Sequence, residues 1–278
     1  MVAVPNVLLN NGVEIPQLGF GVFQIDPSET ADAVSKAFEI GYRHIDTAQM
    51  YGNEKGVGQA FAKSGLDRSE VFITSKLNNN QLGHDAALTA FDKTLADLGL
   101  EKVDLFLIHW PLPTKRDFVE TWKAFEEIYR DGRARSIGVS NFQPHHLRRL
   151  HEETTIPPAV NQIEVHPYLT QEELRAFDDE HGIATEAWSP IAQGKVLDDP
   201  TIVAIAKEHG KTPAQVVLRW HIQHGSIVFP KSVTESRMKE NFEIFDFELP
   251  VSDMGSISAL NKDERTGPDP DVFDYIPA

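Results

Sequence analysis

A short apolar run followed by a helical pattern recurs along this chain, and this alternation limits the possible folds more than any other feature. Parallel strands joined by helical crossovers produce such a pattern, because each crossover returns the chain to the same end of the sheet. Eight strands are expected. They favour a (β/α)8 TIM barrel over a doubly wound sheet, since no Gly-x-Gly-x-x-Gly turn follows any of them. Their ranges are 18–22, 43–46, 71–76, 103–109, 134–140, 159–164, 183–188 and 226–230.

The segments between these strands have the periodicity of amphipathic helices. Ser28 is expected to cap the first helix, and Gly65 and Gly99 are expected to end later ones. Ahead of the first strand, an Asn-Asn-Gly turn at 10–12 between two short apolar runs predicts an N-terminal β-hairpin. No linker or break in composition is visible, so residues 1–278 are expected to form a single barrel domain. The expected helices cover 28–40, 54–63, 85–98, 118–130, 144–153, 171–180, 201–208 and 213–224, with two more starting near 234 and 251.

The composition restricts the partners of the chain. Its formal net charge of −16 argues against nucleic acid or an anionic membrane surface, since both would repel it. No apolar stretch approaches the roughly 18 residues of a membrane span, and no signal peptide is visible. The absence of cysteine excludes disulfides, thiolate metal sites and cysteine nucleophiles, and it fits a reducing cytoplasm. We therefore expect a cytoplasmic protein that acts on small molecules and, without a long apolar surface stripe, a monomer.

Three consecutive expected strands end in chemically active side chains. Asp46, Lys76 and His109 occupy the last positions of the second, third and fourth strands, and Tyr51 follows in a loop. Active sites of such barrels lie at the carboxyl ends of the strands, and adjacent strands are about 4.8 Å apart, so these groups are expected to converge. Singly, each has an ordinary interpretation, such as a helix cap, a packed aromatic, a solvated lysine or a core histidine. Their convergence favours a functional site.

A phenol with a pKa of about 10 is a poor acid at neutral pH, so its neighbours decide what Tyr51 does. We expect Asp46 to keep Lys76 charged, and Lys76, with His109 as a second cation, to lower the pKa of Tyr51. Tyr51 would then donate a proton to a developing alkoxide. His109 would orient that oxygen by a hydrogen bond or share in the proton transfer. The group indicates a polarised, protonated site for a carbonyl oxygen.

A metal-dependent barrel hydrolase is a rival interpretation, because His145, His146 and His151 lie close together in the sequence. They share a helix with Arg148 and Arg149, and this face is expected to be solvated. No His-Glu-x-x-His pattern or clustered aspartate set accompanies them. We therefore expect no metal, and a metal assay of the purified protein decides between the two interpretations.

Four segments, in order, resemble the signatures of the aldo-keto reductase family. They are GYRHIDTAQMYGNEKGVG at 41–58, VDLFLIHWP at 103–111, RSIGVSNF at 135–142 and VFPKSVTESR at 228–237. Within the family, the compact length, the short tail and the Trp-Ser-Pro at 188–190 look most like bacterial 2,5-diketo-D-gluconate reductases. The resemblance implies NADPH-dependent reduction of aldehydes and ketones, such as small dicarbonyls, keto sugars or keto acids. It also implies a catalytic tetrad of Asp46, Tyr51, Lys76 and His109, with Tyr51 as general acid.

The same resemblance implies a nicotinamide cofactor that is bound extended, without a Rossmann fold. Position by position, Ser140, Asn141 and Gln162 would hold the carboxamide, and Trp188, next to Ser189, would stack on the nicotinamide ring. A 2′-phosphate pocket and adenine contacts are implied further along the chain, and the basic residues there make a phosphate site chemically reasonable in an acidic protein. These residues are Lys231, Ser232, Val233 and Arg237 for the phosphate and Glu240 and Asn241 for the adenine.

Positions that correspond to the family's substrate pocket are Phe23, Gln49, Met50, Asn78 and Trp110. Many relatives have an aromatic residue where this chain has Asn78, which suggests a wider or more polar mouth. The short tail, 263–278, suggests an open pocket and broad tolerance. An alternative function is a redox-sensing barrel that binds NADPH with little turnover, which multiple-turnover NADPH consumption distinguishes from a reductase. The physiological substrate stays open between a diketo sugar acid, a methylglyoxal-like aldehyde and a keto ester.

Replacing Arg237 by alanine tests the expected preference for NADPH over NADH. Loss of one charge-assisted hydrogen bond to the 2′-phosphate should raise the KM for NADPH roughly tenfold. The KM for NADH, which lacks that phosphate, serves as the internal control and should stay within about twofold. An unchanged KM for NADPH in steady-state assays contradicts the phosphate assignment.

Overall fold

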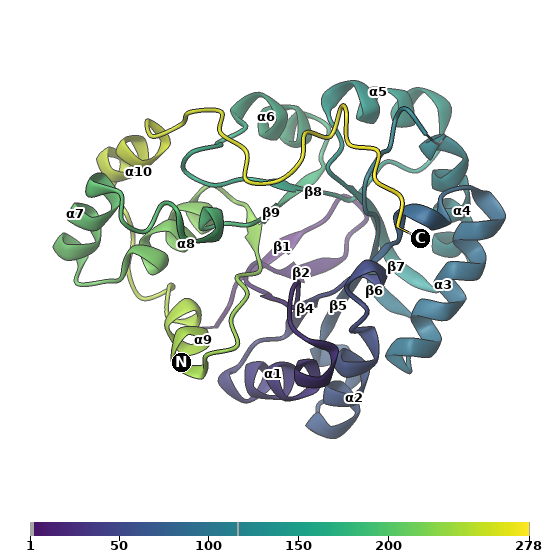
Figure 1. The fold of residues 1–278 in the computed structure, drawn as a ribbon, viewed down its shortest axis with the longest axis horizontal. Coiled ribbons are helices and arrows are strands. Elements are labelled where there is room, and N and C mark those ends of the chain that lie inside the picture. The colour runs from purple at the N-terminus through teal and green to yellow at the C-terminus, as the bar shows by residue number, and fades with distance from the viewer. Residues whose placement is uncertain (1–2, 116, 278) are drawn as a thin grey trace.

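Eight parallel strands form one sheet that closes on itself, with helices around it (Figure 1). The computed structural model describes residues 3–115 and 117–277. The sheet order runs from β10 to β3 in sequence, and a parallel bridge between Leu18 and Val228 joins its two ends. The predicted (β/α)8 barrel is therefore confirmed. The strands are β3 Phe20–Gly21, β4 His44–Asp46, β5 Phe72–Leu77, β6 Val103–Ile108, β7 Ala134–Ser140, β8 Val160–Glu164, β9 Ala184–Trp188 and β10 Ile227–Val228.

Most helices begin and end within one residue of their expected positions. The first helix is an exception in its cap: the Asp26 carboxylate, rather than Ser28, accepts the backbone N–H of Ser28 at 2.8 Å. Pro27 occupies the first helical position, where no N–H is needed, so the cap lies at Asp26, two residues before the expected position. The helices are α1 Pro27–Ile40, α2 Glu54–Ser64, α3 His84–Leu98, α4 Phe118–Arg130, α5 Pro144–Glu153, α6 Glu172–Glu180, α7 Pro200–His209, α8 Pro213–Gln223, α9 Glu235–Phe242 and α10 Val251–Ser258.

The predicted hairpin closes the amino-terminal end of the barrel. β1 Asn6–Leu8 pairs antiparallel with β2 Glu14–Pro16, and Gly12 takes the left-handed conformation that the turn requires, with φ 81°. Leu9 and Ile15 are buried against barrel side chains that include Leu105. In Figure 1 the purple hairpin lies across the centre of the ring. The hairpin thus acts as a floor and leaves the carboxyl ends of the strands as the mouth.

Aromatic packing outside the sheet fixes the strands that carry the expected site. Phe106 on β6 lies between Phe91 of α3 and Phe125 of α4, with ring centroids 4.8 Å away on each side. All three rings are buried. Truncating a buried phenylalanine to alanine typically costs about 3–5 kcal/mol, so this stack holds β6 and the residue that follows it, His109, firmly in place.

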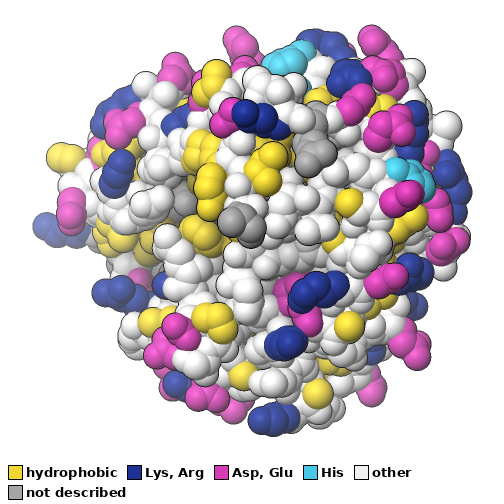
Figure 2. All heavy atoms as spheres, turned by 45° about the vertical axis from the view of Figure 1, so that its right-hand side comes forward, with side chains coloured by type: hydrophobic (Ala, Val, Ile, Leu, Met, Phe, Trp, Pro, Cys, Tyr) yellow, Lys and Arg dark blue, Asp and Glu magenta, His cyan; other side chains and the backbone are white. Residues whose placement is uncertain are grey.

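Charged side chains of both signs are interspersed over the face shown in Figure 2. Within residues 3–115 and 117–277, no helix combines the length and apolar character needed to cross a bilayer. The single-domain organisation stays a prediction.

Asp178 on α6 is a buried acid outside the barrel interior. Its carboxylate accepts hydrogen bonds from the Asn161 amide and the Thr185 hydroxyl, each at 3.3 Å. Burial raises its pKa to about 8, although both hydrogen bonds oppose the shift. In the unfolded chain the pKa of an aspartate is about 3.9. The contribution of protonated Asp178 to the free energy of unfolding is therefore lost progressively as the pH rises from about 4 to about 8.

Replacing Asp178 by asparagine should therefore stabilise the protein at alkaline pH. The amide carries no charge to bury, and it offers a donor to Asn161 Oδ1, which is buried without a partner among the described residues. The Tm gain, measured by calorimetry, should grow between pH 5 and pH 8, by roughly 2–4 °C for each kcal/mol recovered. A Tm difference that does not change with pH contradicts the assignment.

Candidate active site

Lys76 joins three groups at the mouth of the barrel. Its ammonium donates to Asp46 Oδ1 at 2.7 Å, to the Thr47 carbonyl at 2.9 Å and to the Tyr51 hydroxyl at 3.3 Å. Asp46 ends β4, Lys76 is the last but one residue of β5, and Tyr51 ends a 3-10 turn at Gln49–Tyr51. Lys76 is fully buried, yet Asp46 and Tyr51 outweigh burial and raise its pKa. The expectation that Asp46 keeps Lys76 charged is confirmed.

The expected lowering of the Tyr51 pKa is wrong in direction. Burial is the largest influence and raises the pKa above its ordinary value, while the charge of Lys76 opposes the rise. The earlier expectation weighed the cation and left out the loss of solvent, which penalises the phenolate more strongly. The Tyr51 hydroxyl therefore stays protonated at neutral pH.

His109 lies beside Tyr51 but is not a second cation. The two rings meet edge to face, with centroids 5.8 Å apart. Burial and the charge of Lys76 lower the pKa of His109 well below its ordinary value, so the imidazole is neutral. Its Nδ1 is buried and unpaired within the described chain, which leaves Nε2 as the ring nitrogen available to a ligand.

The residues expected to hold a carboxamide form a network with this group. Asn141 donates to the His109 carbonyl at 3.0 Å and accepts from the Trp188 indole at 2.8 Å. Ser140 Oγ donates to the backbone carbonyl of Gln162 at 2.8 Å. Asn141 has φ 64°, a left-handed conformation that asparagine tolerates better than most residues. The structure thus brings the adjacent pair Ser140 and Asn141 together with His109, Gln162 and Trp188, which lie on or next to three other strands.

Gln162 links this network to the acid of the tetrad, since its Nε2 donates to Asp46 Oδ2 at 2.9 Å. Both Asp46 oxygens are therefore engaged, one by Lys76 and one by Gln162. Ser189, after Trp188, has φ 48°. This turn follows the end of β9, and the indole ring of Trp188 is held by its hydrogen bond to Asn141.

The expected phosphate and adenine residues lie between the end of β10 and α9. Lys231, Val233 and Arg237 are exposed, and Ser232 is buried with its Oγ accepting from the Thr234 N–H at 3.1 Å. Glu240 accepts from the Thr212 hydroxyl at 2.8 Å, and Asn241 is buried. Unlike the buried side chains of the tetrad, Lys231 and Arg237 are exposed, so a solvated phosphate can reach them.

Comparisons with known proteins identify the family. Residues 17–262 match the model of the aldo/keto reductase family. An aldo-keto reductase of Mycobacterium sp. (strain KMS) is 55% identical over 271 residues, 98% of each chain. The glyoxal reductase of Bacillus subtilis (strain 168) is 52% identical over 266 residues, 95% of this chain and 96% of its own. The solved structure of a Gox0644 mutant in complex with NADPH has a TM-score of 0.95 at 44% identity, covering 99% of this chain and 100% of that one. The chain belongs to the aldo/keto reductase family.

The substrate positions implied by this family membership are only partly gathered at the mouth of the reductase. Phe23, 53% exposed, packs on Tyr51 with ring centroids 5.0 Å apart. Trp110 is buried against Phe273 of the tail, with ring centroids 4.3 Å apart. Met50 is half-buried in the turn before Tyr51. Phe23 therefore borders the Tyr51 ring, and Trp110 borders the tail.

Gln49 does not face the mouth. Its Nε2 donates to the Ala90 carbonyl and the Thr94 hydroxyl of α3, both at 2.8 Å, and its Oε1 accepts from the Asn78 N–H at 2.8 Å. Gln49 and Asn78 line an outer cavity of about 410 Å³ beside α2 and α3. Gln49 therefore anchors the turn that carries Tyr51, while the side-chain Oδ1 of Asn78 is buried without a partner among the described residues.

The tail crosses the carboxyl end of the barrel, shown in yellow in Figure 1, and the expectation of an open pocket stays a prediction. Glu164, at the end of β8, accepts from the backbone N–H of Thr266 at 2.6 Å and of Gly267 at 3.2 Å. Further along, the Tyr275 carbonyl accepts from the Asn79 amide at 2.9 Å. The sequence analysis missed Glu164, although it ends a strand as Asp46 does.

The histidine cluster is only partly solvated as expected. His145 is exposed, but His146 is buried, and both face Asp271 of the tail closely enough to resemble a metal site. However, His146 Nδ1 accepts the backbone N–H of Gln143 at 3.1 Å, which places the ring proton on Nε2, the atom that faces Asp271. A protonated nitrogen cannot bind a metal, so this chemistry argues against a metal site here.

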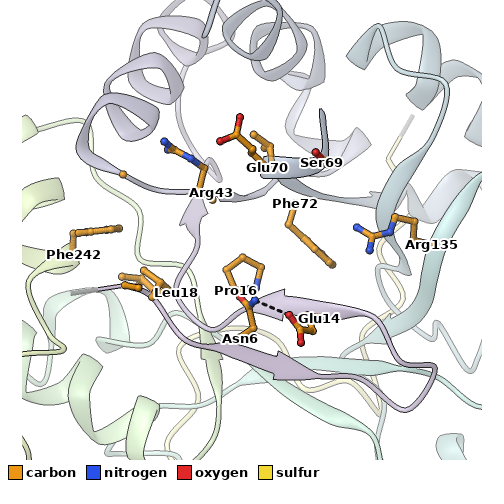
Figure 3. Close-up of a pocket in the computed structure, with 14 residues that line it drawn as sticks. Asn6, Glu14, Pro16, Leu18, Arg43, Ser69, Glu70, Phe72, Arg135 and Phe242 are labelled. Atoms are coloured by element: carbon orange, nitrogen blue, oxygen red, sulfur yellow. Dashed lines mark hydrogen bonds between the residues drawn. The ribbon is translucent and has the colours of Figure 1, made fainter. Parts of the chain in front are cut away.

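The larger of the two described cavities, about 510 Å³, lies at the amino-terminal end of the barrel, away from the tetrad (Figure 3). Arg43, Glu70 and Arg135 line it together with hairpin residues. Arg43 is engaged by the Phe38 and Tyr42 carbonyls and Arg135 by Asp104. This cavity is a gap beneath the hairpin rather than part of the active site.

Replacing Gly267 by alanine should displace the tail from Trp188, because an added Cβ would overlap the indole ring. The expected results are altered Trp188 fluorescence and faster limited proteolysis of the tail. Gly255 to alanine is the matched control, since nothing lies within 4 Å of its Cβ position. Equal proteolysis rates in the two variants contradict the tail contact.

Proposed function

We propose that this chain catalyses the NADPH-dependent reduction of aldehydes and ketones to alcohols, with Tyr51 as the general acid. The chain is an NADP-dependent oxidoreductase by family. The observation that supports this role of Tyr51 is its position: its hydroxyl lies 3.3 Å from the buried Lys76 ammonium, and its ring packs on Phe23. When bound, NADPH supplies the hydride for the carbonyl carbon.

Tyr51 is suited to donate a proton during reduction because it is protonated beforehand. As the proton moves to the substrate oxygen, negative charge develops on the phenol oxygen next to Lys76. Lys76 is held by Asp46 and the Thr47 carbonyl, so its charge is already in place and needs no rearrangement. A positioned acid of this kind contributes about 10²–10⁴-fold to the rate.

His109 is proposed to orient the substrate oxygen. An unpaired buried N–H costs more than an unpaired lone pair, so the proton of the neutral ring is assigned to Nε2 rather than to the enclosed Nδ1. Nε2 then donates a hydrogen bond to the carbonyl oxygen, which places that oxygen beside the Tyr51 hydroxyl. His109 does not compete for the role of acid, because it carries no extra proton.

The described residues fit NADPH in three places. Ser140, Asn141 and Gln162 present a polar edge for the carboxamide, and Trp188 is fixed by Asn141 for stacking. Exposed Lys231 and Arg237, with Ser232, supply charge for the 2′-phosphate in a chain of net charge −16. Ser189 is proposed to complete the nicotinamide pocket and Val233 the phosphate pocket. The third place is the adenine, which Glu240 and Asn241 are proposed to contact.

Small dicarbonyls are the proposed substrate class. A relative covering nearly the whole chain is named a glyoxal reductase, and two of the proposed substrate positions, Phe23 and Trp110, pack on Tyr51 and on the tail, respectively. Keto sugars and keto acids, including the diketo acids suggested by the narrower resemblance, belong in the same substrate panel, read as kcat/KM. The monomeric state, the cytoplasmic location and the absence of nucleic-acid or membrane partners stay predictions.

Replacing Tyr51 by phenylalanine should lower kcat by about 10²–10⁴-fold, while the Kd for NADPH changes less than about twofold. Tyr168 to phenylalanine is the matched control, since its hydroxyl bonds Asp199 outside the tetrad. Because burial raises the pKa of Tyr51, kcat/KM for reduction should persist through neutral pH and fall only at alkaline pH as the acid deprotonates. Wild-type turnover in the phenylalanine variant refutes the acid role.

A further inference from the structure

Glu186 is a buried acid inside the barrel to which neither the sequence motifs nor the proposed mechanism gives a role. It lies in the middle of β9, two residues before Trp188, and is fully buried. Its Oε2 accepts from Gln162 Nε2 at 2.6 Å, and the same nitrogen donates to Asp46 Oδ2 at 2.9 Å. Glu186 therefore ends a chain of contacts that runs through Gln162 and Asp46 to Lys76.

The two acids decide which way the Gln162 amide faces. An amide nitrogen has two N–H groups, and here one is directed to Asp46 and the other to Glu186. Turning the amide over would place its oxygen against the Asp46 carboxylate, which can only accept hydrogen bonds. The side-chain oxygen of Gln162 is thereby left as the free end, and within the described parts of the chain it accepts no hydrogen bond.

Burial and the negative charge of Asp46 keep Glu186 neutral in the free protein at neutral pH. Burial, followed by the negative charge of Asp46 on β4, raises its pKa to about 8, while the Gln162 hydrogen bond and Lys76 on β5 oppose the rise. His44, on the same strand as Asp46, is held neutral by a pKa of about 4. On the other side, Ile227 of β10 pairs with Glu186 and adds no charge. Oε1 is buried without a partner among the described residues.

We propose that Glu186 is a positioning residue which, together with Asp46, holds the Gln162 amide with its carbonyl oxygen directed toward the carboxamide of the cofactor. This role rests on the proposed function, because it gives Gln162 the task of contacting the nicotinamide end. A carboxamide NH₂ is a donor, so an amide oxygen held in advance matches it and saves the cost of ordering the side chain on binding.

The side-chain amide signals of Gln162 in the free protein, followed by NMR, test the contact without any cofactor or activity. In the wild type these signals should shift with a midpoint near pH 8 as Glu186 ionises. In Glu186→Gln the shift should disappear, since the side chain no longer titrates. Asp178→Asn is the matched control: it removes another buried acid whose pKa is about 8 and should leave the Gln162 titration in place. An unchanged titration in Glu186→Gln overturns the proposal.

Binding of NADPH, measured by fluorescence, tests the consequence for positioning. Glu186→Gln keeps a carbonyl acceptor for Gln162 and should bind NADPH within about twofold of the wild type at pH 7. Glu186→Leu removes the acceptor, frees one N–H of the amide, and should weaken binding by about five- to tenfold. Circular dichroism establishes that each variant is folded. If Glu186→Leu does not fold, the NMR titration of Glu186→Gln decides alone.

The proposal and the proposed function fail in different ways. Wild-type protein that consumes no NADPH with any carbonyl of the panel contradicts the reductase function, whatever the variants show. Wild-type affinity for NADPH in a folded Glu186→Leu variant contradicts the positioning role, even when the wild type is an active reductase.

Discussion

The contact between the buried ammonium of Lys76 and its three oxygen partners is the interaction on which the rest of the site depends. A charge enclosed in a barrel is tolerated only when its hydrogen bonds are satisfied, and here a carboxylate, a backbone carbonyl and a phenol satisfy them. All three partners lie between the end of β4 and Tyr51, whereas Lys76 is on β5, so the contact forms only when these two strands are in register. The aromatic stack around Phe106 and the hairpin floor supply the rigidity that this register needs.

Loss of solvent, rather than the nearby cation, sets the protonation states around that ammonium. Burial raises the pKa of Tyr51 and of Glu186 and lowers that of His109. The result is one ion pair, Lys76 with Asp46, surrounded by neutral groups that donate or accept hydrogen bonds. This suits a reaction in which negative charge appears on an oxygen and must be met by a proton and a fixed positive charge.

The two ends of the proposed cofactor site follow opposite physical rules. At the nicotinamide end, Gln162, Asn141 and Trp188 are buried or half-buried and hold one another in place. At the phosphate end, Lys231 and Arg237 are exposed, which lets an acidic protein meet an anionic ligand without burying a charge. The tail adds a third element, since Glu164 ties it over the mouth beside Trp188.

The sequence by itself determined the barrel and the convergence of Asp46, Tyr51, Lys76 and His109, because apolar periodicity and the ends of strands can be read from local spacing. It also located the strands of Asp46, Lys76 and His109 to within a residue. Only the tertiary structure decided the rest: that Gln49 turns outward to α3, that the tail covers the mouth, and that Glu186 reaches Gln162. These outcomes depend on which side chains meet across the barrel and on how much water is excluded there. The sign of the Tyr51 shift belongs with them, because burial is a property of the folded whole and not of any one segment.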